Sequence, residues 1–282
     1  MISKDAINKE LDFLEQTRDL CVSYEQISMM RMNAIKKGVL TTRDFYKDVS
    51  DVYYKVKKVY KKQMVGLEKK RAEKQSKKVS VLLSADNKLY GDILQKVFRE
   101  FVSAIQKEET DIIIVGSLGK SMFDAEGINR PYTYITLPHA DNELTLEDLK
   151  EVIAQLAPYG VIDVYLGKYE SYVNQKPVHL NITGDALFGE EPVVEDPSYY
   201  YFEPSLEKIM SFFETQMVSA LLKQSVFEGQ LARYASRIGS MEEALQAIKK
   251  EGLVKEMQKR KLITQDRDRK QNERIVQLFY RH

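Results

Sequence analysis

The chain has 282 residues, 43% of them apolar and 30% charged, with a formal net charge of +1. This near-neutral balance predicts no bulk attraction to nucleic acid or to anionic membranes. The single cysteine, Cys21, excludes an intrachain disulfide and a cysteine metal cluster, and favours a reducing compartment. We expect no signal peptide and no membrane-spanning helix, because no stretch approaches roughly 18 apolar residues. Any membrane association is therefore expected to come through a partner.

The prolines divide the chain into three parts. All seven lie between Pro131 and Pro204. Because proline breaks helix interiors, long helices are permitted at both ends of the chain. Residues 205–282 contain only three glycines, and as one helix they would be about 117 Å long at ~1.5 Å per residue. The pattern predicts two long terminal helices with a compact domain between them.

The first part shows helical apolar spacing, with a shift in phase after Leu14. The predicted stripe consists of Ile7, Leu11, Leu14, Leu20, Tyr24, Ile27 and Met30, and it resumes at Phe45, Val49, Val52, Val56 and Val59. The run Lys55–Lys78 then carries eleven Lys and Arg residues against two Glu. We interpret it as a solvated helix end and linker rather than a nucleic-acid arm, because no aromatic residues interleave after Lys61.

Strand and helix patterns alternate in the middle part. Strands are predicted at Val79–Leu83, Asp111–Val115, Tyr132–Leu137, Val161–Leu166 and Val178–Ile182. Helices are predicted at Ile93–Ile105 and Leu146–Leu156, the second with Thr145 as its N-cap. Residues Gly184–Ser198 are predicted to form a loop. Such alternation indicates an α/β layer domain with a largely parallel sheet.

The last part has the most regular pattern. Its apolar residues follow strict three-four spacing: Leu231, Tyr234, Ile238, Met241, Leu245 and Ile248. This spacing is typical of a coiled-coil seam. Its partner should be the N-terminal helix, since neither helix can bury its stripe alone.

Two segments that follow strands have a superficial likeness to phosphate-binding loops. In Gly116–Ser121, the first glycine of such a loop would fall at Ile114, so we predict a strand-ending turn instead. The segment Asp86–Gly91 is interpreted as a turn with a helix cap, because the Asp86 carboxylate would repel an anion. The histidines at 139, 179 and 282 are isolated. We therefore predict no catalytic, cofactor or metal site.

Several blocks resemble the gamma subunit of F-type ATP synthases. The C-terminal blocks are Tyr201–Ser205 with Ile209 and Gln216, Ala232-Arg233 with Glu242-Glu243-Ala244, and Ile263–Asp266, which is similar to the family's Ile-Thr-Gln-Glu. The N-terminal and middle blocks are Thr17, Glu25, Arg31 and Met32, and then Ser84, Asp86, Leu89 and Gly91, which match its Ser-Asp-Arg-Gly-Leu-Cys-Gly loop. The chain departs from the family pattern at Asn87, Lys88, Asp92, Glu228-Gly229, Lys259-Arg260 and the bulky tip Leu278–His282.

The resemblance implies a fold and a role. The fold is a long antiparallel coiled coil of N- and C-terminal helices with an inserted Rossmann-like α/β domain, divided at residues 1–76, 77–200 and 201–282. The role is that of a non-catalytic central-stalk rotor, which couples rotation of the membrane rotor ring to ATP synthesis or hydrolysis on the beta subunits. The implied partners are the alpha and beta subunits of the head, the epsilon subunit and the ring. The implied location is the cytoplasmic face of the bacterial plasma membrane.

The resemblance also implies which residues bind partners. The matched positions are Glu25, Arg31, Met32, Arg233, Thr264 and Gln265. Lys259 and Arg260 are expected to form transient pairs with acidic loops of the head, since exposed ion pairs are worth only ~0–1 kcal/mol. Three other functions stay open: a coiled-coil adaptor with an α/β head, a gamma paralogue of a different rotary ATPase, and a small α/β enzyme. The missing catalytic constellation disfavours the last.

Overall fold

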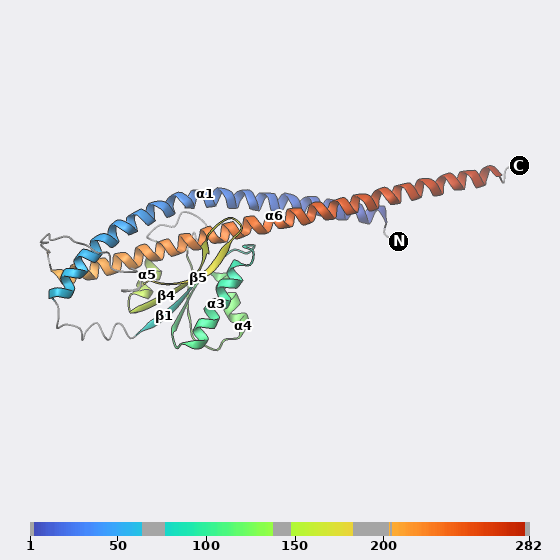
Figure 1. Ribbon diagram of the computed structural model, residues 1–282. Coiled ribbons are helices and arrows are strands. Elements are labelled where there is room, and N and C mark those ends of the chain that lie inside the picture. The colour runs from blue at the N-terminus through green and yellow to red at the C-terminus, as the bar shows by residue number, and fades with distance from the viewer. Residues whose placement is uncertain (1–2, 64–76, 138–147, 183–202, 204, 280–282) are drawn as a thin grey trace. The chain divides into compact units, whose positions relative to one another are not determined.

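A computed structural model describes residues 3–63, 77–137, 148–182, 203 and 205–279 (Figure 1). The chain forms two compact units: residues 1–28 with 238–282, and residues 29–237. The elements in chain order are α1 (Lys4–Gln63), β1 (Lys78–Leu83), α3 (Ile93–Lys107), β2 (Asp111–Val115), α4 (Ser117–Glu126), β3 (Thr133–Ile135), α5 (Lys150–Leu156), β4 (Val161–Tyr169), β5 (Gln175–Asn181) and α6 (Leu206–Phe279). The predicted boundaries at residues 76 and 200 lie outside the described residues and stay predictions.

The two terminal helices confirm what the proline distribution predicted. Helix α1 has 60 residues and α6 has 74. Gly38 and the three glycines of α6 leave them uninterrupted, although a glycine inside a helix costs about 1 kcal/mol relative to alanine. Within the described residues, neither these helices nor the shorter ones are apolar enough over a sufficient length to cross a membrane.

The buried face of α1 follows a seven-residue repeat that agrees with the predicted stripe at Ile7 and Val56 but not throughout. Among the side chains that the structure describes in α1, every buried one falls at the first or fifth position of a heptad counted from Ile7: Ile7, Cys21, Ser28, Met32, Ile35, Tyr53 and Val56. The prediction was wrong for Leu20, Ile27, Met30 and Val52, which are exposed. The large apolar residues gave the wrong phase because small residues, Cys21 and Ser28, occupy the seam.

In the first unit, the start of α1 pairs with the later part of α6, as antiparallel packing requires (Figure 1). Ile7 on α1 and Met241 on α6 are buried, and Lys255 forms an ion pair with Glu10 at 2.5 Å. This pairing raises the pKa of Lys255 through its hydrogen bond to Glu10. The predicted α6 seam is confirmed: its first four members are buried and Leu245 and Ile248 are half-buried.

The second unit holds a five-stranded sheet in the order β3-β2-β1-β4-β5. The strands β1 to β4 pair in parallel, and β5 pairs antiparallel with β4 at the edge. Pro177 lies in β5, which is consistent with an edge strand because proline cannot donate a ladder hydrogen bond. The largely parallel sheet was predicted, although β4 extends to Tyr169 and β3 is shorter than expected.

Helices α3 and α4 share one face of the sheet (Figure 1). Phe101 of α3 lies 6.5 Å from Phe123 of α4 and packs edge-on against Tyr165 of β4 at 5.4 Å, measured between ring centroids. Helix α4 corrects the prediction of a simple turn at Gly116–Ser121. Helix α5 begins only at Lys150, with Leu149 in the cap position. The proposed cap, Thr145, and the loop at 184–198 lie outside the described residues.

Candidate functional site

One segment of α6 is buried on every side. The thirteen consecutive residues Ser225–Arg237 are all buried, which amounts to more than three helical turns. A helix on the surface of a protein buries only one face. The segment nevertheless contains three charged residues, Glu228, Arg233 and Arg237. Buried charges require partners. We therefore expect specific polar contacts around this enclosed segment, Ser225–Arg237.

The enclosed segment lies across the carboxyl ends of the central strands. In open α/β sheets, ligands bind in the crevice where the strand order reverses, which here is beside β1 and β4. A Cβ on Gly167 of β4 would lie 3.1 Å from the Cβ of Ala232 and 2.8 Å from Ile93, so only glycine admits α6 this closely. Val226 and Arg233 lie over the ends of β1 and β2, where a cavity of about 10 Å³ remains. That is room for about one water molecule.

The glycines of the Gly116–Ser121 segment serve packing rather than phosphate binding. Gly116 has φ of +98°, and a Cβ there would lie 2.8 Å from the backbone nitrogen of Ala85. The first N–H groups of α4 are already bonded: Ser117 donates to the Asp86 carboxylate at 2.8 Å, and Leu118 donates to the Ala85 carbonyl at 2.9 Å. A carboxylate therefore occupies the helix N-terminus at which a phosphate would bind.

A joint connects the enclosed segment to the loop between β1 and α3. The Arg237 side chain donates from Nη2 to the carbonyl of Lys88 at 2.8 Å and from Nε to the carbonyl of Leu89 at 3.1 Å. Its guanidinium also lies 3.8 Å from the centroid of the Tyr90 ring. Arg237 is 4% exposed and Tyr90 is 2% exposed. Hydrogen bonding and cation–π stacking thus hold one buried cation in a fixed orientation.

The joint continues into α1 through an aromatic pair. The Tyr90 ring meets the Tyr234 ring edge-on, with centroids 6.1 Å apart. Arg31 of α1 donates from Nη1 to the Tyr234 hydroxyl at 3.4 Å. The guanidinium carbon of Arg233 lies 5.9 Å from the centroid of the Tyr90 ring. Three segments that are far apart in the sequence therefore meet here: α1, the β1–α3 loop and α6.

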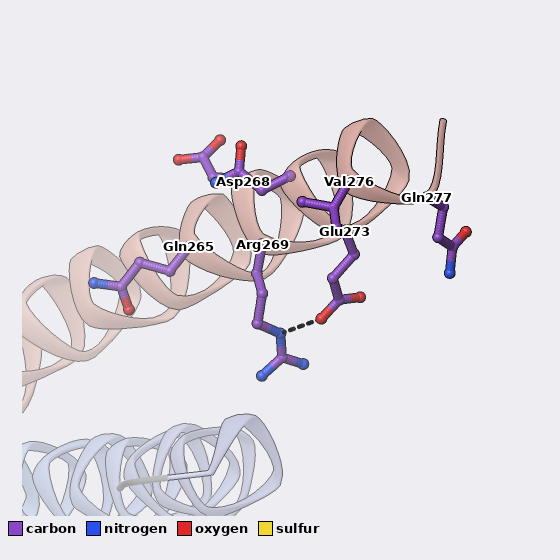
Figure 2. Close-up of a pocket in the computed structure, with 7 residues that line it drawn as sticks. Gln265, Asp268, Arg269, Glu273, Val276 and Gln277 are labelled. Carbon is purple, nitrogen blue, oxygen red and sulfur yellow. Dashed lines mark ion pairs between the residues drawn. The ribbon is translucent and has the colours of Figure 1, made fainter. Parts of the chain in front are cut away.

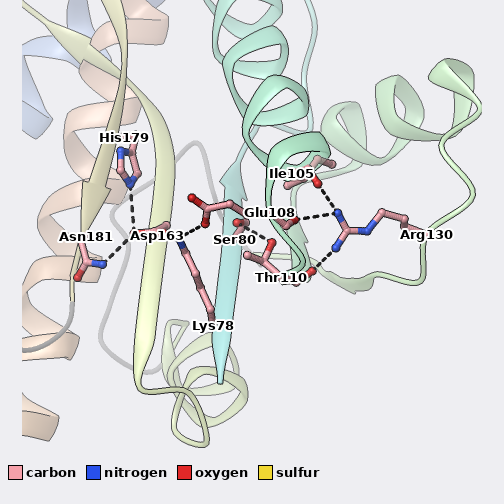
Figure 3. A network of polar contacts seen from close by, with 9 residues as sticks. All are labelled: Lys78, Ser80, Ile105, Glu108, Thr110, Arg130, Asp163, His179 and Asn181. Atoms are coloured by element: carbon pink, nitrogen blue, oxygen red, sulfur yellow. Dashed lines mark hydrogen bonds and ion pairs between the residues drawn. The ribbon is translucent and has the colours of Figure 1, made fainter. Parts of the chain in front are cut away.

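A second polar network, centred on the buried Asp163, lies at the opposite end of the strands (Figure 3). The Asp163 carboxylate forms an ion pair with Lys78 Nζ at 3.0 Å and accepts a hydrogen bond from Asn181 Nδ2 at 2.9 Å. His179 Nε2 lies 3.1 Å from the same carboxylate. Lys78 also pairs with Glu108. Burial alone would raise the pKa of Asp163, but the hydrogen bonds from Lys78 and His179 and the charge of Lys78 hold it below its usual value.

The groups of this network satisfy one another. Hydrogen bonds to Glu108 and then to Asp163 raise the pKa of Lys78. Arg130 donates to the backbone carbonyls of Ile105, Glu108 and Thr110 and joins the end of α3 to β2. Within the described residues, no three His, Cys, Asp or Glu side chains are grouped to hold a metal ion. The network is therefore suited to bracing the sheet rather than to binding a ligand.

The far end of α6 has the opposite character. Leu262 is half-buried, and all fifteen residues of Ile263–Gln277 are exposed. Figure 2 shows its side chains projecting from a single helix, with an ion pair between Arg269 and Glu273 at 3.6 Å. The hollow between Gln265 and Gln277 is lined by this helix alone. It is therefore an open groove on the helix surface and not an enclosed cavity.

Comparison with known proteins decides the family. A family model described as ATP synthase matches residues 3–262, almost the whole chain. The chain belongs to the family of ATP synthase gamma subunits. Its relatives include the ATP synthase gamma chain of Pelotomaculum thermopropionicum, 22% identical over 84% of each chain. Another is the gamma chain of Ruthia magnifica subsp. Calyptogena magnifica, 20% identical over 86% of this chain and 87% of that one.

Solved structures show the same fold. A chain of the Tetrahymena thermophila mitochondrial ATP synthase central stalk and c-ring has a TM-score of 0.61, with 16% identity over 80% of this chain and 99% of that one. A chain of the Euglena gracilis mitochondrial ATP synthase has a TM-score of 0.55 and 14% identity, over 89% of this chain and 94% of that one. The family match ends at residue 262, which is also the last half-buried residue of α6.

The predicted partner-binding residues of this gamma-family chain fall into different environments. Arg260, Thr264 and Gln265 are exposed on α6, whereas Lys259 is half-buried on the seam side. On α1, Glu25 and Arg31 are half-buried. Met32 and Arg233 are buried among residues of this chain, so what the structure shows of them is internal packing. Their roles toward partners stay predictions.

The joint at Arg237 and Tyr90 was missed by sequence reasoning. Arg237 stands beside the seam residue Ile238, and a charged residue there is ordinarily solvated. Its acceptors lie 148 and 149 residues earlier in the chain. The sequence offered only one signal, the Leu89-Tyr90-Gly91 segment after a predicted strand. In the structure Leu89 has φ of +69° and Gly91 has φ of +62°. Only the fold brings that loop to α6.

Proposed function

We propose that this gamma-family chain is the non-catalytic rotating shaft of an F-type ATP synthase, and that it couples rotation of a membrane ring to ATP synthesis or hydrolysis on beta subunits. The observation that carries the proposal is the placement of α6 in the crevice of the α/β domain. In a ligand-binding α/β domain this crevice is open. Here the same helix that pairs with α1 fills it, so the domain holds a helix where an enzyme would hold a substrate.

Two further features support a non-catalytic role. The N-terminus of α4 is capped by Asp86, and the remaining cavity beside it is about 10 Å³. The Asp163 network contains an acid, a lysine and a histidine, but Lys78 and His179 are both bonded to the Asp163 carboxylate. Neither place combines a free reactive group with room for a nucleotide. Calorimetry with ATP on the isolated chain should therefore detect no micromolar binding, and measurable binding would revive the enzyme alternative.

The proposed partners follow from the structures that share the fold. One of those structures is described as a central stalk with its c-ring, and another as an assembly of OSCP, F1 and c-ring. We assign this chain the corresponding contacts: alpha and beta subunits around the coiled coil, and an epsilon subunit and rotor ring beside the α/β domain. The complex would place it at the cytoplasmic face of a bacterial plasma membrane.

Specific side chains are proposed for the contact with the head. Arg260, Thr264 and Gln265 are exposed at the point where α6 continues without α1. An exposed charge such as that of Arg260 forms ion pairs that break and reform easily, because each is worth only ~0–1 kcal/mol, while Thr264 and Gln265 offer neutral hydrogen-bonding groups. A shaft that turns inside a collar requires such weak, replaceable contacts. Lys259 is assigned the same role with a smaller contribution, because part of its side chain faces the seam.

The test is purification of the tagged full chain from native membranes under mild detergent. The expected result is co-purification of alpha- and beta-type subunits in fixed stoichiometry, with ATPase activity in the complex and none in the isolated chain. A matched control is Ile238→Asp, which disrupts the seam and should lose these partners. Recovery of the wild-type chain alone, or with unrelated proteins, would favour the adaptor alternative.

A further inference from the structure

We propose that Arg237 and Tyr90 form the torsional joint of the shaft, so that Arg237 is a positioning residue for rotary coupling. The inference rests on the proposed function, in which torque passes between the α/β domain and α6. Directional bonds link the two at the joint: both donors are on α6, and both acceptors, the carbonyls of Lys88 and Leu89, are on the β1–α3 loop.

The chemistry of the joint suits resistance to twisting. Apolar contacts are non-directional, so a helix held only by them can turn about its axis until side chains clash. A planar guanidinium has fixed donor directions and a flat face. Arg237 uses both, because its two nitrogens fix it to the loop backbone while its face lies 3.8 Å from the Tyr90 ring centroid. Rotation of α6 about its axis would break the hydrogen bonds and the stacking together.

The loop is shaped to present these acceptors. Leu89 has φ of +69°, a conformation that residues with a side chain rarely adopt, and the residue is 51% exposed. Packing of the leucine side chain therefore gives no reason for the strained backbone. The strain turns the Lys88 and Leu89 carbonyls toward Arg237. Backbone strain that surrounding contacts maintain is characteristic of functional positions.

The neighbouring contacts hold the joint on a second side. Tyr90 is wedged between Arg237 and Tyr234, and the Tyr234 hydroxyl accepts a hydrogen bond from Arg31 of α1. Gly167 allows Ala232, five residues before Arg237 on α6, to approach β4 closely. The ring at the centre of the joint therefore cannot move aside without disturbing both long helices.

The experiment measures torsional stiffness in the assembled complex. A rod-shaped probe is attached to the α/β domain, the head is immobilised and stalled without ATP, and the angular variance of the rod is recorded. Arg237→Met keeps an apolar chain of similar length but removes the directional bonds. We expect its angular variance to rise at least about twofold, because two charge-assisted hydrogen bonds are lost. Arg237→Lys should give an intermediate rise, and Tyr90→Leu a rise similar to that of Arg237→Met.

Arg130→Met is the matched control. Arg130 also donates to backbone carbonyls, but these belong to Ile105 and Thr110 within the α/β domain. It should lower thermal stability and leave the angular variance at the wild-type value. Wild-type complexes that fail to rotate with ATP would refute the proposed function itself. If the wild type rotates, an unchanged variance in Arg237→Met and Tyr90→Leu would overturn the joint, and so would failure of every joint variant to assemble.

Discussion

The enclosed segment and the exposed end of α6 belong to one continuous helix but are stabilised in different ways. In Ser225–Arg237 every residue is buried, and three of the thirteen are charged. In Ile263–Gln277 every residue is exposed, and seven of the fifteen are charged. The first is stabilised by burial and by specific partners for its charges. The second shows local pairs such as Arg269 with Glu273, which are worth about 0.3–0.5 kcal/mol each.

This difference shows that helix continuity and helix burial are separate properties. The absence of proline permits one helix of 74 residues. Where small residues such as Gly229, Ala232 and Ala235 occur together, the helix can be approached closely from several sides. Where charged residues dominate, no internal partner covers it. Within a single helix, composition therefore decides which part is anchored and which part is available to a partner.

The sharpest test of the comparison introduces the same charge in both environments. Ile238 directly follows the enclosed segment and is 5% exposed, whereas Ile275 in the exposed end is 43% exposed. Ile238→Asp should destabilise the chain by about 3–5 kcal/mol, because an unpaired carboxylate would be buried. Ile275→Asp should change stability by no more than about 0.5 kcal/mol. Urea unfolding followed by circular dichroism measures both.

A smaller effect is expected from adding one methyl group. Gly167→Ala places a Cβ 2.8 Å from Ile93 and 3.1 Å from Ala232, and such overpacking costs about 1–3 kcal/mol. In Gly252→Ala the new methyl group meets nothing within 4 Å. That variant should gain about 0.5–1 kcal/mol from improved helix propensity. Thermal melts of the two variants should shift in opposite directions. A Gly167→Ala melt equal to wild type would show that β4 and α6 separate easily.

The sequence predicted the architecture of the molecule better than its contacts. The proline distribution, the α6 seam and the alternating strand patterns depend on local periodicity, and the elements they predicted are present. The predicted phase of α1 was wrong in its middle part. There Cys21 and Ser28 occupy the buried heptad positions, whereas the larger Leu20 and Ile27 are exposed. A pattern of large apolar residues indicates a helix, but it identifies the buried face only when the seam itself is large and apolar.

The functional contacts were less predictable for a physical reason. Arg237 and Tyr90 meet because of the strand order and the path of α6, and nothing local to either residue encodes the other. The Gly116–Ser121 segment was predicted to have no phosphate-loop role, but the reason for its glycines appeared only in their approach to Ser84 and Ala85. Close backbone packing and phosphate binding both require glycine, so composition alone does not separate them.

The Asp163 network should produce a pH-dependent stability that an exposed pair lacks. The pKa of Asp163 is lowered in the folded chain, mainly by Lys78 and His179 acting against burial. A lowered pKa gives stability that is present above the unfolded value of about 3.9 and is lost as pH falls through the folded value. The difference in unfolding free energy between wild type and Asp163→Asn should therefore be constant near neutral pH and shrink below about pH 4.

The control for this prediction is Asp92→Asn. Asp92 is 64% exposed and pairs with Lys96 at 2.8 Å in the same domain. Its removal should have a small effect at every pH, because solvent screens the pair. The pKa of Lys78 is raised in the folded chain, so Lys78 sets a limit at high pH. Its contribution to the free energy of unfolding is present below the pKa of the unfolded chain and is lost as pH rises through the pKa of the folded chain. Equal pH profiles for both variants would contradict a special role for burial at Asp163.

The smallest predicted effect concerns the exposed part of α6 in the assembled complex. Arg260 is exposed and Lys259 half-buried, four and five residues before the exposed Thr264. Lys259→Glu with Arg260→Glu should lower ATPase turnover severalfold at low salt, since rim ion pairs are each worth up to ~1 kcal/mol. Assembly should survive, because such charges contribute little to binding affinity.

The dependence of the defect on ionic strength, and a matched double variant, distinguish this role from a structural one. The defect should shrink as ionic strength rises, because the Debye length falls from ~10 Å at 0.1 M to ~3 Å at 1 M. Lys249→Glu with Lys250→Glu reverses two exposed charges earlier in α6 and should leave turnover unchanged. Wild-type turnover in the Lys259 and Arg260 double variant at low salt would remove these residues from the mechanism. Loss of assembly would instead mean that the half-buried Lys259 supports the seam, and that weak contacts with the head begin only at Thr264.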